Sequence, residues 1–187
     1  MTRASEINLT KLLISERHKI HLIGVAGSGM SGIAALLLEL GHEVSGSDKV
    51  STMETDRLQR LGLRFREEHR AEDASDAELV IFSSAIKIDN PILLSARDSG
   101  KPVVRRAEAL AAIIEGKRGI VIAGMHGKTT TSAMAAHVLR EGGLHPRITS
   151  ARKSRFSEPT RTGTRAANIL SRKAMKAMGR SSIFIPN

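Results

Sequence analysis

Residues 19–32 read KIHLIGVAGSGMSG, an apolar run followed at once by a glycine-rich turn and a helix-like segment. Gly27, Gly29 and Gly32 have the G-x-G-x-x-G spacing of a dinucleotide-binding turn, in which glycines permit a tight turn, close approach to a pyrophosphate and helix packing. Asp48 follows the next strand-like run, where an acid commonly meets a ribose hydroxyl. The stretch predicts a Rossmann-like unit that binds a nucleotide; the alternative is a glycine turn that only packs.

Apolar strand-like runs alternate with helix-like segments along this part of the chain. The expected strands cover residues 19–25, 42–46, 78–82 and 102–104, and the expected helices cover residues 30–40, 53–61, 91–98 and 106–114. Strands that alternate with helices indicate a parallel sheet covered on both faces. The predicted fold class is therefore α/β, with a Rossmann-like parallel-sheet domain at the N-terminus.

A second strand-loop-helix pattern begins at residues 119–123, an apolar run that leads into the loop GMHGKTTT at 124–131. The two glycines let backbone N–H groups approach a polyphosphate, and the following helix directs its positive end toward the anion. Lys128 would neutralise phosphate oxygens, and Thr129 has the hydroxyl that commonly binds Mg²⁺. The loop is shorter than the standard G-x-x-x-x-G-K-[ST], so an ordinary strand-to-helix turn is the alternative.

Composition narrows the class of protein. The chain has 187 residues, a net charge of +10 and no Cys, Trp or Tyr. Without cysteine there are no disulfides and no cysteine metal sites. No apolar run approaches the roughly 20 residues of a membrane span, and the N-terminus lacks the apolar core of a signal peptide. We therefore expect a cytoplasmic protein that makes no membrane contact.

Five motifs occur in the order in which the Mur ligases carry them. They are residues 21–34, 44–48, 83–86 with Asn90 and Pro91, 106–108, and 124–131. On these motifs the chain resembles the Mur ligases over about residues 15–146. Met125 departs from the family pattern, which usually has Thr there, and this leaves the affinity of the loop for ATP open.

The resemblance implies a domain organisation and an activity. Residues 1–116 would form a domain that binds a UDP-linked substrate rather than NAD, and residues 117–146 would begin a P-loop ATP-binding central domain. The implied activity is an ATP-dependent ligase of peptidoglycan synthesis. It phosphorylates the lactyl carboxylate of UDP-N-acetylmuramate and lets the amine of L-alanine attack the acyl phosphate. The implied cofactors are ATP and Mg²⁺.

The resemblance also implies roles for single residues. The UDP part would contact Gly27, Ser28, Gly29, Met30 and Ser31, with Asp48 on the uridine side and Ser84 near the substrate. ATP would contact Gly124, Met125, His126, Gly127, Lys128, Thr129 and Thr130. Lys128 would stabilise the transferring phosphoryl group and Thr129 would hold Mg²⁺, since catalysis in such a site is mainly positioning and charge stabilisation. His126 is equally consistent with a loop histidine that has no catalytic task.

The resemblance stops at residue 146, and residues 147–187 hold ten Lys or Arg residues but one acid. Such a stretch is typical of a disordered segment or a nucleic-acid-binding arm. A third interpretation is out-of-frame translation, because residues 173–179, back-translated in a shifted frame, fit the family's acidic motif Gly-Asp-Glu-Ser-Asp-Gly. On that interpretation we expect a truncated chain that binds UDP-sugar through its first domain but lacks ligase turnover.

Two other functions stay open at this point. A nicotinamide-dependent oxidoreductase would use the same glycine turn but would not need Lys128. A nucleic-acid-binding protein would use the basic tail, in which Phe156 and Phe184 are the aromatic residues able to stack on bases. The sequence makes no prediction of the oligomeric state.

Overall fold

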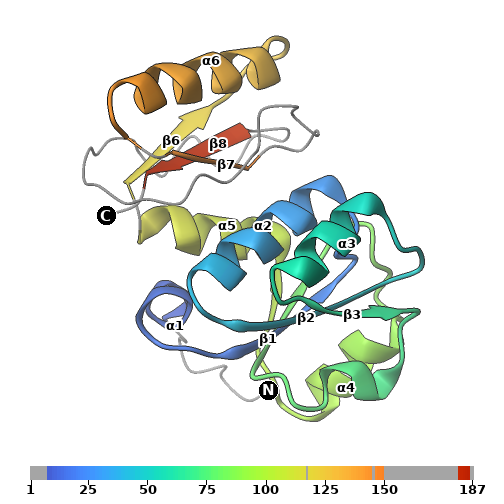
Figure 1. Cartoon of the computed structure of the whole chain (residues 1–187). Helices are drawn as coiled ribbons and strands as arrows, with labels where there is room; N and C mark the ends of the chain where they lie inside the picture. The colour runs from blue at the N-terminus through green and yellow to red at the C-terminus, as the bar shows by residue number, and fades with distance from the viewer. Residues whose placement is uncertain (1–7, 117, 145, 150–180, 186–187) are drawn as a thin grey trace. The chain divides into compact units, whose positions relative to one another are not determined.

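The structure is a computed structural model that describes residues 8–116, 118–144, 146–149 and 181–185. The chain divides into two compact units, Met1–Ile113 and Ile114–Asn187 (Figure 1). The domain boundaries expected at residues 116 and 146 stay a prediction. Within the described residues, no helix is long and apolar enough to cross a membrane.

The first unit is built on a five-stranded parallel sheet with strand order β3-β2-β1-β4-β5. Its strands are β1 (Lys19–Ile23), β2 (Glu43–Asp48), β3 (Arg64–Glu67), β4 (Leu79–Phe82) and β5 (Val103–Arg105). Its helices are α1 (Leu9–Ser15), α2 (Ser28–Glu39), α3 (Met53–Arg60), the 3-10 helix η1 (Ala71–Ala74), α4 (Pro91–Asp98) and α5 (Arg106–Glu115). Figure 1 shows α2 and α3 on one face of the sheet and α4 on the other. The predicted α/β class with a parallel sheet is confirmed.

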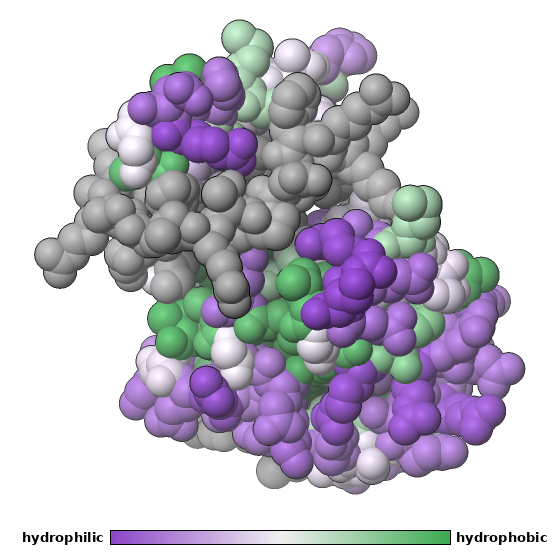
Figure 2. Space-filling model, in the orientation of Figure 1, coloured by the Kyte–Doolittle hydropathy of each residue, from purple (hydrophilic) through white to green (hydrophobic). Residues whose placement is uncertain are grey.

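The core of this unit forms where the central strand meets the helices. Three side chains of β1, Ile20, Leu22 and Ile23, are fully buried, as a strand covered on both faces requires. On α2, the residues at positions 30, 33, 34 and 37 are buried, and their spacing places them on one face of the helix. The lower part of the unit in Figure 2 is mainly hydrophilic, which fits apolar side chains gathered inside.

Three elements of the first unit were absent from the sequence-based expectation: β3, α1 and the four-residue 3-10 helix η1. Strand β3 has the sequence Arg-Phe-Arg-Glu and pairs with β2 at the edge of the sheet, so it lacks the apolar run by which the other strands were recognised. Helix α1 has seven residues, which is too few for a clear period of apolar positions. Helix α4, in contrast, spans Pro91–Asp98 as expected, with Asn90 as its N-cap and Pro91 at its first turn.

Gly46 of β2 lies under the glycine-rich loop and leaves no room for a side chain. A Cβ atom at this position would lie 2.9 Å from Cβ of Val25, whose side chain is fully buried. Valine is stiff at χ1, so the clash cannot be relieved by a rotamer change. We expect Gly46→Ala to lower the free energy of unfolding by about 1 to 3 kcal/mol, measured by urea titration with far-UV circular dichroism.

A double variant separates this clash from a general intolerance of alanine in β2. Val25→Gly removes all three atoms that the new Cβ would meet, which are Cβ, Cγ1 and Cγ2 of Val25. In that background Gly46→Ala should cost clearly less than it does in the wild type. Equal costs in the two backgrounds would contradict the proposed clash.

The second unit contains β6 (Arg118–Ile122), α6 (Lys128–Glu141), β7 (Arg147–Thr149) and β8 (Ser181–Ile185). β6 and α6 match the expected strand and helix. Strand β8 lies between the other two strands and pairs antiparallel with both, so this sheet is not purely parallel.

Strands β7 and β8 lie within residues 147–187, for which a disordered segment was one of three interpretations, and disorder does not hold for these two strands. The sequence of β8, Ser-Ser-Ile-Phe-Ile, is rich in β-branched and aromatic residues, which favour a strand. Residues 150–180 and 186–187 lie outside the described residues, and so does the segment on which the out-of-frame interpretation depends. That interpretation stays a prediction.

Candidate functional site

The strand order of the first unit locates a candidate ligand site. From β1 the chain builds β2 and β3 on one side and β4 and β5 on the other. Doubly wound parallel sheets bind ligands outside the carboxyl ends of their strands, at the point where the strand order reverses. That point lies between β1 and β4. The loop after β1 and the loop after β4 meet there, because a Cβ atom at Gly24 would lie 3.1 Å from Cβ of Ser83.

The glycine-rich loop after β1 is held by the end of β2. The N–H groups of Gly24 and Val25 donate to the carbonyl oxygen of Ser47, at 2.8 and 3.2 Å. The N–H of Ala26 donates to Oδ2 of Asp48 at 2.9 Å. Gly24 has a φ of +84°, a conformation that favours glycine. The Asp48 carboxylate, expected on the uridine side, therefore also anchors the loop.

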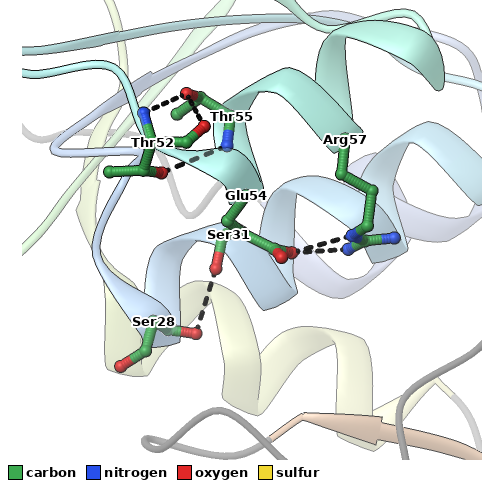
Figure 3. Close-up of polar contacts among 6 residues, drawn as sticks. All are labelled: Ser28, Ser31, Thr52, Glu54, Thr55 and Arg57. Atoms are coloured by element: carbon green, nitrogen blue, oxygen red, sulfur yellow. Dashed lines mark hydrogen bonds and ion pairs between the residues drawn. The ribbon is translucent and has the colours of Figure 1, made fainter. Parts of the chain in front are cut away.

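The residues at the start of α2 differ in what they offer a ligand. The carbonyl oxygen of Gly27 accepts hydrogen bonds from the N–H groups of Met30 and Ser31, both at 2.9 Å. Met30 is buried in the core, and the Ser31 hydroxyl donates to the carbonyl oxygen of Ser28 (Figure 3). This placement favours Gly27, Ser28 and Gly29 over Met30 and Ser31 as pyrophosphate contacts. The positive end of the α2 dipole supports an anion at the same place.

Arg106 lies against this helix start. A Cβ atom at Gly29 would lie 2.8 Å from Nη1 of Arg106 and 3.3 Å from its Cζ. A guanidinium next to a glycine turn and a helix N-terminus suits a pyrophosphate, because arginine bonds phosphate oxygens in a bidentate way. Arg106 belongs to the motif at residues 106–108, but the sequence alone predicted no role for its side chain. Its position directly after a strand of the parallel sheet was the available signal.

Helix α3 begins close to the same edge of the sheet, because it follows β2. Its first turn is closed by a capping box in which the N–H of Thr52 donates to Oγ1 of Thr55 at 2.8 Å, and the N–H of Thr55 donates back to Oγ1 of Thr52 at 3.3 Å. Arg57 donates through Nε and Nη2 to Oε1 of Glu54 (Figure 3). These contacts fix the helix start next to α2, against which α3 packs.

Ser84 lies in the turn after β4 and is exposed. Its neighbour Ser83 accepts a hydrogen bond from the N–H of Ala85 through its hydroxyl, at 3.3 Å. The structure therefore places Ser84 at the same edge of the sheet as the glycine-rich loop. Its expected closeness to the substrate stays a prediction.

The second candidate site is the loop between β6 and α6. Gly127 is the N-cap of α6 and has a φ of +76°, which explains the need for glycine. Nζ of Lys128 donates to the carbonyl oxygens of Gly124 at 2.6 Å and Met125 at 2.9 Å. The ammonium group would have to exchange these carbonyl partners for phosphate oxygens when a nucleotide binds.

The remaining residues expected to contact ATP lie in the same loop and first helical turn. Met125, His126 and Thr130 are exposed, and Thr129 is half-buried. Within the described residues, no group of three or more His, Cys, Asp or Glu side chains could hold a metal ion. Thr129 has the hydroxyl expected of a Mg²⁺ ligand in such a loop, but no cluster of acidic or histidine ligands accompanies it among the described residues. The residues present therefore fit the metal only in part.

Comparison with known proteins gives a consistent result for the first unit. The family model described as "Mur ligase family, catalytic domain" matches residues 19–118. The chain is 49% identical over 129 residues to a UDP-N-acetylmuramate–L-alanine ligase of Sinorhizobium medicae, covering 69% of this chain and 27% of that protein. A ligase of the same name from Anaeromyxobacter dehalogenans is 51% identical over 135 residues, covering 72% and 30%.

Solved structures of related proteins agree. The UDP-N-acetylmuramate-alanine ligase of Thermotoga maritima has a TM-score of 0.65 and 35% identity, with 68% of this chain and 30% of that chain covered. A UDP-N-acetylmuramate:L-alanyl-gamma-D-glutamyl-meso-diaminopimelate ligase of Neisseria meningitides has a TM-score of 0.63 and 30% identity, covering 70% and 41%. The chain thus spans about three tenths of the length of the curated relatives that it matches.

Proposed function

Because the chain belongs to the Mur ligase family, we propose that its first unit binds the UDP half of UDP-N-acetylmuramate at the carboxyl edge of the sheet. The observation that carries this proposal is the meeting of a glycine-rich turn, the start of α2 and the Arg106 guanidinium. Together they form a cradle for a pyrophosphate. The names of the relatives supply the identity of the sugar nucleotide.

The proposal for the second unit is an ATP phosphate site. Lys128 would move from the carbonyl oxygens of the loop to phosphate oxygens, and Thr129 would bind Mg²⁺. When bound, Mg²⁺ would neutralise charge on the transferring phosphoryl group. The loop carries Met125 where the family usually has Thr, and the Met125 side chain is 87% exposed.

The proposed reaction is the ATP-dependent joining of L-alanine to UDP-N-acetylmuramate through an acyl phosphate, in peptidoglycan synthesis and in the cytoplasm, where ATP is available. The parts of it that the described residues support are the binding of the sugar nucleotide and of the ATP phosphates. The amine-binding part rests on the names of the relatives alone.

Isothermal titration calorimetry of the 187-residue chain tests the first part of the proposal. We expect UDP-N-acetylmuramate and UDP to bind at one common site, each displacing the other, because both carry the pyrophosphate and the uridine. NADH shares the pyrophosphate and a ribose but has neither uracil nor N-acetylmuramate, so it should bind more weakly or not at all. Tight binding of NADH without binding of UDP-N-acetylmuramate would support the oxidoreductase and contradict the proposal.

A further inference from the structure

A chain of four polar side chains runs from the interior of the first unit to the carboxyl edge of its sheet. Oγ of Ser45 lies 2.9 Å from Nδ1 of His21, and Nε2 of His21 lies 3.1 Å from Oγ of Ser47. Oγ of Ser47 also lies 2.9 Å from Nδ1 of His69. The first three residues are buried and His69 is half-buried. A buried network thus ends on a side chain that reaches the surface beside the candidate UDP site.

The network restricts the state of the His69 ring. Burial lowers the pKa of His21 to about 4, so His21 is neutral near pH 7 and has a single ring N–H. The Ser47 hydroxyl has one proton, so it donates to only one of the two imidazoles that it contacts. Burial also lowers the pKa of His69, although the nearby Asp48 carboxylate opposes this. His69 is therefore a neutral ring whose tautomer is coupled to that of His21.

The backbone also directs His69 to this position. β3 runs beside β2 with Glu67 opposite Asp48, and the N–H of Glu68 donates to the carbonyl oxygen of Asp48 at 2.8 Å. Glu68 has a φ of +73° and is the only non-glycine residue in the left-handed region among the described residues. This conformation costs about 1 kcal/mol or more for a residue with a Cβ atom. The strained turn brings His69 back toward Ser47.

The position of His69 indicates which half of the ligand its side chain would contact. In doubly wound folds the acid after the second strand lies on the ribose side of the pyrophosphate. Asp48 occupies that place, and His69 lies next to it, whereas Arg106 lies at the start of α2. The nucleoside would thus be bound near His69 and the pyrophosphate near Arg106.

We propose that His69 binds the nucleoside half of the substrate through Nε2 and that the Ser47–His21 pair holds the ring for this contact. Nδ1 and Nε2 lie on opposite sides of an imidazole, so the bond from Nδ1 to Ser47 directs Nε2 away from the interior. Within the part of the chain that the structure describes, no protein group bonds to Nε2. A neutral imidazole nitrogen can donate to or accept from a uracil or ribose group. This inference rests on the proposed function.

Two substitutions separate ligand binding from a purely structural tie between β3 and β2. His69→Asn places an amide near the position of Nδ1, which can keep the bond to Ser47, but has no group at the position of Nε2. His69→Gln instead places its amide near the position of Nε2. If Nε2 binds the nucleoside, His69→Asn should weaken the binding of UDP and of UDP-N-acetylmuramate by the same factor, about 3- to 10-fold. His69→Gln should retain more of the affinity.

Nitrogen NMR of the wild-type chain adds a direct measurement. The ¹⁵N shift of Nε2 in His69 should change when UDP is added. His42 is the matched control, because its Nδ1 accepts from the N–H of His18 and its Nε2 donates to the carbonyl oxygen of Leu13. Both nitrogens of His42 should keep their shifts.

The outcomes distinguish this inference from the proposed function. If the wild-type chain binds neither UDP nor UDP-N-acetylmuramate, the proposed function and the inference about His69 are both contradicted. If it binds them and His69→Asn binds them equally well, with Nε2 of His69 unchanged on adding UDP, only the inference is overturned and His69 is a structural tie. Weaker binding by His69→Asn at unchanged thermal stability, together with a shifted Nε2 signal, supports it.

Discussion

Alanine in place of Arg106 is expected to weaken the binding of UDP-N-acetylmuramate by about 10- to 100-fold, which corresponds to the loss of charge-assisted hydrogen bonds. The guanidinium lies against Gly29 at the start of α2, where the helix dipole already favours an anion. Removing it leaves the pyrophosphate with backbone donors alone. Calorimetric titration of the variant with UDP-N-acetylmuramate measures the effect, and circular dichroism verifies that the fold is kept.

Arg105 offers a matched control for this prediction. It precedes Arg106, and its side chain is exposed; it is the backbone N–H of Arg105 that bonds to Glu108. Arg105→Ala therefore removes the same charge from the adjacent position, the last residue of β5, and should change the affinity little. Arg106→Lys keeps the charge but not the fork of donors, so it should recover part of the affinity. Equal losses for Arg105→Ala and Arg106→Ala would mean that general charge, not a bound guanidinium, attracts the ligand.

The sequence was sufficient to predict the elements that bury many apolar side chains. β1 and α2 belong to this class, because their apolar residues have the periods of a strand and of a helix. α4 could be located to the residue, since Asn90 and Pro91 mark a helix start in the sequence itself. The order of strands and helices then restricts the fold to a parallel sheet.

Elements stabilised by a single neighbour could not be predicted in the same way. β3 pairs with β2 alone, and three of its four side chains are exposed. Its strand conformation follows from the free hydrogen-bonding edge of β2 rather than from its own residues. β8 differs in having two neighbours, but its pairing could not be predicted either, because β6 and β7 lie far from it in the sequence.

The residues of the candidate site also divide into those that a local sequence pattern predicts and those that it does not. The glycine-rich stretch alone located the loop after β1, where the φ of +84° at Gly24 favours glycine. The contact of Arg106 with Gly29, and that of His69 with Ser47, join segments far apart in the chain. No local pattern encodes these contacts. The bond from the N–H of Ala26 to Asp48 likewise joins two segments that no local pattern relates, and the contact of Asp48 with uridine stays a prediction.

His21 is expected to make the first unit sensitive to acid. Its pKa is lowered from 6.5 to about 4, chiefly because burial disfavours the charged ring. The unfolded chain therefore binds a proton at a higher pH than the folded chain does. The stability is fully present above pH 6.5 and is lost as the pH falls toward 4. The linkage relation gives a loss of about 2 kcal/mol between pH 7 and pH 5 from this residue alone.

Urea titrations at pH 7 and pH 5, followed by far-UV circular dichroism, measure this loss; the chain has no Trp or Tyr whose fluorescence could report unfolding. His21→Asn keeps a polar side chain but cannot titrate, so it should lose about 2 kcal/mol less than the wild type over this range. Burial also lowers the pKa of His42, but His42 bonds to His18 and Leu13 and not to His21 or Ser47, so its contribution is the same in the two proteins and cancels in the difference.

Ser47→Ala distinguishes titration of His21 from loss of its hydrogen bonds. This variant removes one partner of the ring but leaves the ring buried, and burial is the main cause of the lowered pKa. It should be less stable than the wild type at pH 7 and yet keep most of the dependence on pH. If His21→Asn and the wild type lost equal stability between pH 7 and pH 5, the ring would have to accept a proton in the folded state without cost. The interior around β1 and β2 would then admit water, and the hydrogen-bonded chain from Ser45 to His69 could not hold a single neutral arrangement.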